Sequence, residues 1–470
     1  MSRGTVAVPG GSLVAESKSK AVSAAAKINY SVAMIGAGMT DLPVDVLLIP
    51  FYTEVMAVGA AAVGWIALVA GIWDGVIDPF IGQFSDRLRT RWGRRRPFLL
   101  FTAIPYGLTF GLLFAPTVAN PALWFLILFL LFRLTGSLVL IPHVSLGAEM
   151  SEDYDERSSI MGYNRAFFIA GVLLGVFVPT LLLEFLPDDI LQSYRILGLI
   201  IGLVVALTVL YTFFTTREDK SHQHIPTIDY KQGLKLIWQN GAFKILTISY
   251  LLYHTAQAIT VTLLVYFAIY WMKISEATIL MAIPIYLGVA LIAVPGWVWL
   301  SKRVDKNKAF MLSLTVSMLS TASLFLVPEG GIYVIYGIMA FAGVGYGGMM
   351  ALPPAILADI VDMDELQSRE RREGIYYGTW EFIRQVCSNL GRWAPMMGLA
   401  MLGYVAGAQV QLPRVVQGIR VMFSFGPAVL YLISATIMAS FPLTRKAHQE
   451  IRRQLEAVRA QPADLEAAYD

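Results

Sequence analysis

The stretch Gly71-Ile-Trp-Asp-Gly-Val-Ile-Asp-Pro79 places two acidic residues inside a long apolar run. A cationic loop follows it, Ser85-Asp-Arg-Leu-Arg-Thr-Arg-Trp-Gly-Arg-Arg-Arg-Pro97. Asp74 and Asp78 are four residues apart, so a helix would present both on one face. Each charge at bilayer depth costs about 2.5 to 3.5 kcal/mol on insertion scales and therefore needs a partner. The pattern predicts a membrane helix whose carboxylates face a cation, or else a structural pair bonded to neighbouring helices.

The composition is that of a polytopic membrane protein. Of the 470 residues, 56% are hydrophobic and only 15% are charged, and the mean hydropathy is +0.62. A soluble protein of this size is not so apolar. The formal net charge of +3 is small, and the basic residues lie beside apolar runs, which indicates contact with lipid headgroups and excludes nucleic acid as the main partner. Cys387 is the single cysteine, so no disulfide forms within the chain.

Twelve apolar runs are long enough to cross a membrane, because about 20 helical residues span roughly 30 Å of hydrocarbon. They lie near residues 29–55, 58–84, 97–117, 120–148, 159–186, 191–215, 241–271, 276–300, 308–328, 331–361, 374–405 and 417–441. The sequence therefore predicts an all-α integral membrane protein with twelve transmembrane helices.

The segment 216–240 is the one clear break in this pattern, and it divides the chain into 29–215 and 241–441. Two acid-rich helix ends correspond across the break, around Glu149 and around Asp359, and the loop 85–96 has a weaker counterpart in 301–308. Such a repeat predicts two pseudo-symmetric six-helix bundles with a substrate site between them, near the middle of the bilayer.

Basic residues predict the orientation of the bundle. They crowd the segments 85–96, 216–244, 301–308, 368–373 and 445–459, whereas the opposite loops contain few of them. By the positive-inside rule, the central loop and both tails, 1–28 and 442–470, are cytoplasmic. The first tail lacks an apolar core and is expected to be disordered.

Several motifs together resemble the glycoside, pentoside and hexuronide cation symporters, the melibiose permease-like family of the major facilitator superfamily. They are the Asp78-Pro79 helix end, the loop from Ser85 to Phe98, Ile141-Pro142, and the loop from Asp362 to Gly374. The resemblance runs from about Ile35 to Leu443. It implies the major facilitator fold, cation-coupled symport of a small solute by alternating access, a bacterial inner membrane and a monomer, with no cofactor besides the coupling ion.

The resemblance also implies a cation site formed by Asp74, Asp78 and the hydroxyl of Ser137. The family's further acid in the fourth span is replaced here by Leu140. Two carboxylates, Ser137 and backbone carbonyls still offer the oxygen ligands that a sodium ion needs. Alternatively, one of the acids carries a proton. The choice between sodium and a proton stays open.

At the solute positions the family's pattern is only partly kept. Asp41 and Arg165 match its sugar-binding acid and arginine, but its aromatic positions hold Val144 and Met350, and its lysine is Gln385. A melibiose-type galactoside site is therefore not expected. A rebuilt sugar or glycoside site would use the polar residues Asp41, Asp45, Arg133, Arg165, His143, Tyr377, Trp380 and Glu381.

A second solute class stays open. The chain also resembles the sodium-dependent lysophospholipid symporters, in which Arg165 would meet a phosphate. Leu140, Val144, Met349 and Met350 would then line an acyl chain, because methionine-rich walls adapt to flexible apolar ligands. Since apolar residues are common in any membrane helix, this pattern is weak by itself.

Three polar residues have two interpretations each. Asp45 lies one turn from Asp41 and would either relay a proton with it or pair with an arginine such as Arg133. His143 and His254 would carry protons or form hydrogen-bonded contacts between helices.

Charged residues near the cytoplasmic helix ends are predicted to act mechanically. Opposite charges there can lock the two halves together when the pathway opens outward, and the arginines also anchor the helices in headgroups. The residues are Asp86, Arg87, Arg94, Arg95, Arg96, Glu149, Asp153, Glu156, Arg157, Asp362, Asp364, Glu365 and Arg369.

An enzyme is not expected. The five histidines are scattered at His143, His222, His224, His254 and His448, without the acid spacing of a zinc site. A channel would show a continuous polar pore and would not require charge locks in two halves.

Overall fold

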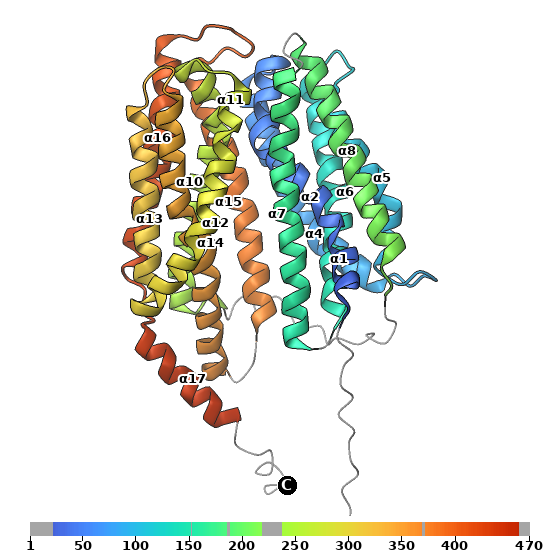
Figure 1. The fold of residues 1–470 in the computed structure, drawn as a ribbon, viewed down its shortest axis with the longest axis vertical. Helices are drawn as coiled ribbons and strands as arrows, with labels where there is room; N and C mark the ends of the chain where they lie inside the picture. Colours follow the sequence, from blue (N-terminus) through green and yellow to red (C-terminus); the bar gives the residue numbers. More distant parts are fainter. Residues whose placement is uncertain (1–21, 152, 186–188, 219–236, 369–371, 460–470) are drawn as a thin grey trace, which may run out of the picture.

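The computed structural model describes residues 22–151, 153–185, 189–218, 237–368 and 372–459. Residues 1–21 and 460–470 of the two predicted tails, most of the central loop (219–236) and Arg369 lie outside the described residues. Within the described ranges the regular structure is helical, apart from one short bridge between Thr90 and Gly93. The long helices stand side by side in a tall bundle (Figure 1).

The first span, Ala24–Val55, is an interrupted helix. Two π-helical turns, at Pro43–Leu47 and Phe51–Val55, break it where Pro43 and Pro50 lack the N–H that a regular helix needs. The remaining helices of the first half are longer and regular. The elements are α1 (Ala24–Ser31), α2 (Ala33–Leu42), α3 (Leu48–Pro50), α4 (Ala60–Arg87), α5 (Arg96–Leu113), α6 (Pro121–Glu149), α7 (Tyr154–Phe185) and α8 (Ile190–Thr215).

The start of α1 corrects the prediction of a disordered tail through residue 28. The helix begins at Ala24, because the side chain of Ser23 accepts a hydrogen bond from the backbone N–H of Ala26 at 3.2 Å. Lys27 then pairs with Glu156 at 2.9 Å, which fixes the first turns of α1 against α7.

The second half repeats this plan. Its first span, Gly241–Met272, also ends in a π-helical segment, Phe267–Met272. The elements are α10 (Gly241–Tyr266), α11 (Glu276–Leu280), α12 (Ala282–Arg303), α13 (Lys306–Ser323), α14 (Ile332–Ser368), α15 (Glu373–Leu402) and α16 (Pro413–Met438), followed by the amphipathic α17 (Arg445–Arg459).

Among the described residues, eleven helical stretches are long and apolar enough to cross a membrane. The expected twelfth is α15, which has the length of a span but carries Glu381, Arg384 and Arg392 in its middle turns. The arrangement is consistent with the predicted twelve helices.

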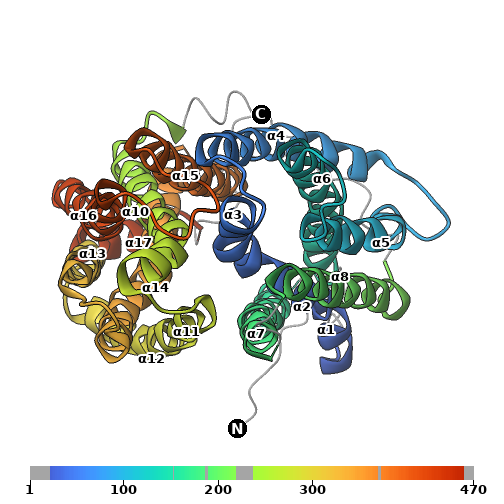
Figure 2. The ribbon, with the colours of Figure 1, turned by 90° about the horizontal axis from the view of Figure 1, so that it is seen from above.

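The two halves make matching helix contacts, which confirms the predicted pseudo-symmetric fold. In the first half, α5 packs on α6 and α8, and α2 packs on α7; in the second half, α13 packs on α14 and α16, and α10 packs on α15. Seen from above, each half forms its own group, and the groups meet where α4 lies against α15 and α7 against α11 (Figure 2).

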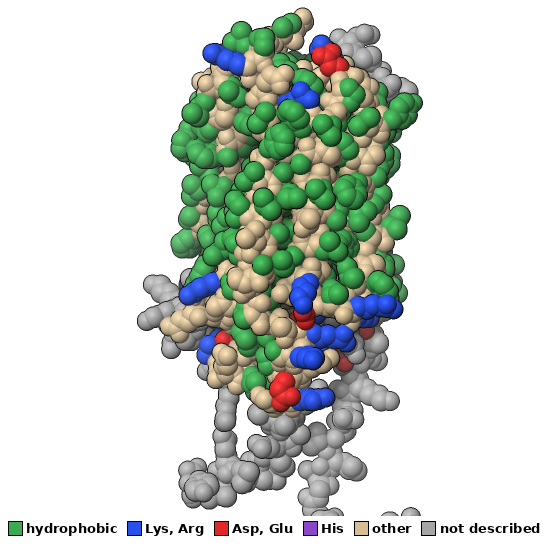
Figure 3. Space-filling model, turned by 90° about the vertical axis from the view of Figure 1, so that its left-hand side faces the viewer, with side chains coloured by type: hydrophobic (Ala, Val, Ile, Leu, Met, Phe, Trp, Pro, Cys, Tyr) green, Lys and Arg blue, Asp and Glu red, His purple; other side chains and the backbone are tan. Residues whose placement is uncertain are grey.

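A broad belt of the outer surface is apolar. Exposed side chains such as Phe80, Leu199 and Ile292 belong to it, and Figure 3 shows hydrophobic side chains over most of one face. Lysine and arginine side chains gather on that face toward one end. We name the end with the start of α1 and with α17 the termini end, and the opposite end the far end.

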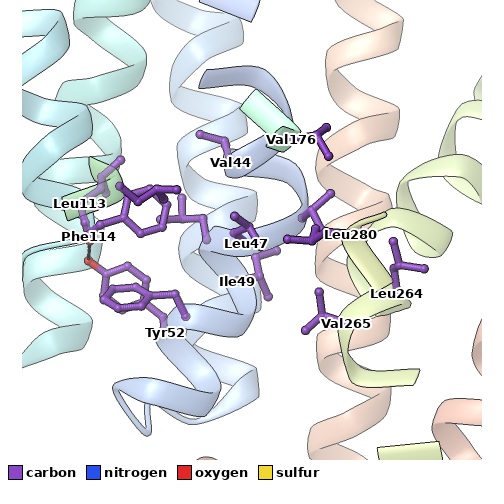
Figure 4. Packing of buried hydrophobic residues seen from close by; sticks show 14 of the residues in the cluster. Val44, Leu47, Ile49, Tyr52, Leu113, Phe114, Val176, Leu264, Val265 and Leu280 are labelled. Atoms are coloured by element: carbon purple, nitrogen blue, oxygen red, sulfur yellow. Dashed lines mark hydrogen bonds between the residues drawn. The ribbon is translucent and has the colours of Figure 1, made fainter. Parts of the chain in front are cut away.

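One hydrophobic cluster joins the two halves at the far end. Leu47 and Ile49 of the first half pack in it together with Leu264, Val265 and Leu280 of the second (Figure 4). The members of the other large cluster lie between Ile237 and Phe441, so this cluster is entirely in the second half. The apolar contact between the halves is therefore concentrated at the far end.

Candidate cation and solute site

The seam between α4 and α15 brings the two acids of the first half against the second half. At Gly71 a Cβ atom would lie 2.0 Å from the side-chain Cγ of Asn389, and at Gly64 it would lie 2.8 Å from Cβ of Met396. Only glycine permits such close approach of two membrane helices. As a result, polar side chains of α15 reach the level of Asp74 and Asp78.

Asp74 is buried, with 7% of its surface exposed. Its Oδ1 accepts a hydrogen bond from Oγ of Ser137 at 3.1 Å, and its Oδ2 lies 3.6 Å from a guanidinium nitrogen of Arg133. Ser137 was placed at this site by the family resemblance, and here it lies beside Asp74. Arg133, expected among the solute contacts, lies beside a carboxylate of the candidate cation site.

Asp78 is contacted from the second half of the protein. Its Oδ2 accepts a hydrogen bond from Nε2 of Gln385 at 3.1 Å. Its Oδ1 is buried and has no hydrogen-bond partner among the described residues. Buried polar atoms rarely stay unpaired, so this oxygen is a place where a cation or a proton would be stabilised.

Within the described residues, no group of three or more histidine, cysteine, aspartate or glutamate side chains is arranged to hold a metal ion. The oxygen donors that the family resemblance assigned to the cation site are Asp74, Asp78 and Ser137, and Ser137 lies beside Asp74. Carboxylate and hydroxyl oxygens are the ligands that a hard cation prefers.

Asp45 pairs across the halves with Arg392, which is not the partner expected from the sequence. One guanidinium nitrogen of Arg392 donates to Asp45 and another donates to Oδ1 of Asn389 at 3.0 Å. Arg392 was missed, although an arginine inside the apolar run 374–405 is a signal in its own right.

Further polar side chains lie on α2, α7 and α15. Asp41 and Arg165 are exposed, and the guanidinium of Arg165 rests 4.9 Å from the ring centre of Phe168. Glu381, predicted as a solute contact, pairs with Arg384, whose Nε lies 2.9 Å from the carboxylate. These side chains include both carboxylates, which accept hydrogen bonds, and guanidinium groups, which donate them.

The apolar candidates differ in exposure. Val144 is 49% exposed and follows Ser137 by two helical turns on α6, so it extends the same helix face. Met350 is half-buried and Tyr377 is exposed.

Two predicted solute contacts, His143 and Trp380, are buried between helices in this structure. His143 is fully buried, stacks on Tyr30 with ring centres 4.3 Å apart, and has Nε2 3.1 Å from the side-chain nitrogen of Asn164. Trp380 is buried against Tyr250, with ring centres 3.6 Å apart. Both side chains pack between helices. His254 likewise lies against the rings of Tyr250 and Tyr253, which favours a contact between side chains over proton transfer.

Comparison with known proteins decides the family. A family model described as MFS/sugar transport protein matches residues 29–445. This chain belongs to that family. The putative glycoside/cation symporter YagG of Escherichia coli K12 is 26% identical, over 92% of this chain and 95% of its own. The sodium-dependent lysophosphatidylcholine symporter 1-A of Danio rerio is 22% identical, over 94% of this chain and 90% of its own.

Among solved structures, a D-xylose–proton symporter matches with a TM-score of 0.65, 15% identity and coverage of 90% of this chain and 98% of its own. This likeness shows the fold. The resemblance to the glycoside–cation symporters is confirmed. The chain is a multi-pass, cation-coupled symporter of the major facilitator type, and its relatives are transporters.

The far end of the symporter is closed by hydrogen bonds between its halves. Tyr270 donates to Oε2 of Glu54 at 2.5 Å, and Tyr404 donates to Oε1 of the same carboxylate. Tyr194 donates to Glu276 at 2.6 Å. These bonds join the halves across the same end as the mixed hydrophobic cluster, and sequence reasoning did not find them.

At the termini end, Arg94, Arg95 and Lys306 form ion pairs with partners of their own half. Arg94 and Arg95 contact Glu149 at 2.7 and 2.8 Å, and the corresponding contact of the second half is Lys306 with Asp359 at 2.7 Å. The contacts match the sequence repeat. These three contacts lie within each half and do not join the halves to each other.

Several other charged residues of the predicted gate contact partners of their own half. Arg95 contacts Asp86 at 2.9 Å, and Nε of Arg157 donates to the backbone oxygen of Ser151 at 2.6 Å. The others are Asp362, 3.1 Å from His448, Asp364, 3.9 Å from Arg372, the exposed Arg87 and the half-buried Glu365.

Proposed function

We propose that this symporter moves a sugar or glycoside together with one sodium ion or proton, by alternating access. The observation that carries the proposal is the buried, unpaired Oδ1 of Asp78 on the seam where the two halves touch. One helical turn away is Asp74, which accepts a hydrogen bond from Ser137. A monovalent cation there would receive oxygen ligands and compensate the carboxylate charge.

The same position explains how cation binding would be coupled to movement. Asp78 lies in the first half, and the side chain that donates a hydrogen bond to it, Gln385, lies in the second half. A cation that engages Asp78 changes the strength of this contact, so it favours one arrangement of the halves over another. Coupling requires such a difference in interaction free energy between states.

The solute would bind to the polar side chains of α2, α7 and α15. Asp41 and Arg165 are exposed, and the Glu381–Arg384 pair adds donors and acceptors. Sugar hydroxyls need such convergent groups, because each unpaired hydroxyl costs about 1 to 3 kcal/mol.

A lysophospholipid is the second candidate, and one observation favours it. Val144 exposes an apolar side chain on the α6 face that also carries Ser137 and Leu140, where it would contact an acyl chain. Arg165 would then bind the phosphate. A relative with 22% identity is named as a lysophosphatidylcholine symporter.

For the membrane, we propose a bacterial inner membrane with both termini in the cytoplasm and a monomeric protein. Lysine and arginine gather toward the termini end (Figure 3), as the positive-inside rule requires of a cytoplasmic face.

The test is a thermal-melt panel in lipid nanodiscs. Sugars, glycosides and lysophospholipids are each added with and without sodium, at two pH values. A ligand at a hundred times its Kd adds about 2.7 kcal/mol to the stability of the folded state. A cation-dependent shift with a sugar supports the proposal, and a shift only with a lysophospholipid supports the second candidate. No cation-dependent shift with any class contradicts both.

Matched variants accompany the panel. Asp78→Asn should lose the cation-dependent part of the shift. Glu329→Gln removes a carboxylate from an exposed ion pair with Lys273, and it should respond as the wild type does.

A further inference from the structure

We infer that Arg133 is a built-in counter-cation, which competes with the coupling ion for Asp74 and thereby sets the affinity for that ion. The inference rests on the proposed cation site and adds a specificity-determining residue to it. It follows from the position of Arg133 on α6 and from the quality of its contact with Asp74.

Arg133 and Ser137 lie one helical turn apart and approach the two oxygens of one carboxylate. Ser137 donates to Oδ1 of Asp74 at 3.1 Å, and a guanidinium nitrogen of Arg133 lies 3.6 Å from Oδ2. A cation bound between Asp74 and Asp78 would therefore compete with the guanidinium of Arg133 for the negative charge of Asp74. The guanidinium cannot release a proton to avoid this competition, because arginine stays charged in proteins.

The contact between Arg133 and Asp74 is weak enough for a cation to replace it. At 3.6 Å it is longer than the roughly 2.7 to 2.9 Å of a charge-assisted hydrogen bond. Nε of Arg133 has no hydrogen-bond partner among the described residues, and 22% of the side chain is exposed. The guanidinium can rest on the ring of Phe129, 5.0 Å away, as a cation–π contact.

Arg392 provides the contrast within the same site. Its side chain is 9% exposed and donates both to Asp45 and to Asn389. An arginine that donates hydrogen bonds to two partners is fixed in place, whereas Arg133 has the 3.6 Å contact with Asp74 and the cation–π contact with Phe129. Of these two arginines, Arg133 is the one that an arriving cation can displace.

The charge balance leaves room for one monovalent ion. Asp74 and Asp78 carry two negative charges when ionised, and Arg133 offsets one of them. The remaining charge is concentrated at Asp78, whose Oδ1 is unpaired. When the ion leaves, the guanidinium returns to Asp74, which prevents two bare carboxylates from facing each other and promotes release of the ion.

The experiment measures cation binding without solute. Purified protein in nanodiscs is titrated with sodium by calorimetry, and proton uptake is followed in parallel with a pH-sensitive dye. Arg133→Gln should bind the ion that the wild type binds about tenfold more tightly, the lower end of what one nearby opposite charge does to a carboxylate. Arg133→Lys keeps the charge and should stay near the wild type.

Arg303→Gln is the matched control, because it removes one positive charge from the end of α12, where Arg303 rests on Trp299. It should bind the ion as the wild type does. Equal or weaker binding by Arg133→Gln, in a variant whose melting curve shows that it is folded, overturns the inference.

Failure of the proposed function gives a different pattern. If Arg133→Gln combined with Asp78→Asn still binds the ion tightly, or if neither the wild type nor any variant binds sodium or a proton, the cation site itself is wrong. Tight binding in Arg133→Gln that is lost on adding Asp78→Asn supports both the site and the inference.

Discussion

Nε2 of Gln385 lies 3.1 Å from Oδ2 of Asp78, and this hydrogen bond joins α15 of one half to α4 of the other. The bond leaves the second oxygen of Asp78 unpaired. A neutral amide at this position holds the carboxylate without neutralising it. Gln385 therefore links the cation site to the seam and keeps the site able to accept a positive charge.

Replacing Gln385 with lysine should weaken cation binding by about tenfold or more, because an ammonium beside Asp78 supplies the charge that the ion would bring. The measurement is a sodium titration with parallel proton uptake. Gln385→Met, of similar size and without charge, separates loss of the hydrogen bond from added charge. A lysine variant with wild-type affinity would show that Asp78 does not hold the ion.

Glu54→Gln should open the far end more often. The carboxylate of Glu54 accepts hydrogen bonds from Tyr270 and Tyr404 across the halves, and a hydrogen bond to a charged group contributes about 1.5 to 3 kcal/mol. A cysteine introduced at the buried Val265, in a Cys387→Ser background, should then react with an impermeant maleimide about tenfold faster, since 1.4 kcal/mol is a factor of ten.

The control for that experiment is Glu329→Gln, which removes a carboxylate from an exposed ion pair with Lys273 and should not change the labelling rate. If Glu54→Gln labels no faster than the control, the hydrogen bonds to Glu54 do not hold the far end shut.

Glu218→Ala should destabilise the loop between α4 and α5. The carboxylate accepts hydrogen bonds from the backbone N–H groups of Arg94 and Arg95 at 2.9 and 3.0 Å, at the start of α5. Their loss should cost about 1 to 3 kcal/mol and lower the apparent melting temperature. Glu329→Ala, from an exposed pair, should change it little. Equal melting curves for the two variants would refute a structural role for Glu218.

Docking of α17 should weaken in acid. The hydrogen bond from Lys308, and then that from the backbone N–H of Arg445, hold the pKa of Asp305 below its ordinary value. A lowered folded-state pKa stabilises the docked state above the ordinary value of about 3.9, and this stabilisation is lost as the pH falls through the lowered pKa.

Hydrogen exchange of α17 should therefore speed up below about pH 4 after correction for the intrinsic rate. Asp305→Asn should exchange faster at pH 6 and show a smaller change on acidification. An identical pH response in the variant and in the wild type would mean that Asp305 does not secure this helix.

Local sequence patterns predicted the parts of the site that lie on one helix. The spacing of Asp74 and Asp78 indicated a shared face, and the repeat around Glu149 and Asp359 indicated two corresponding halves. The contacts Arg95–Glu149 and Lys306–Asp359 are equivalent in the two halves. Apolar run lengths located the spans, because the bilayer fixes the length of a crossing helix.

Contacts between segments distant in the sequence could not be predicted from local patterns. Arg392 and Asp45 are 347 positions apart, and Tyr270 and Glu54 are 216 apart, so no local pattern pairs them. The sequence also did not indicate the direction in which the side chains of His143 and Trp380 point. Helices in a membrane are apolar toward the lipid and toward the protein, which removes the periodic signal that identifies a buried face in a soluble helix.

The most direct test of cation-coupled transport is solute accumulation in proteoliposomes under an imposed sodium or proton gradient, with the solute identified by thermal melts. The wild type should concentrate the solute above the external level only while the gradient lasts. Asp78→Asn, folded by its melting curve, should at most equilibrate the solute. Gradient-driven accumulation by Asp78→Asn equal to that of the wild type would contradict the assignment of the coupling ion to Asp78.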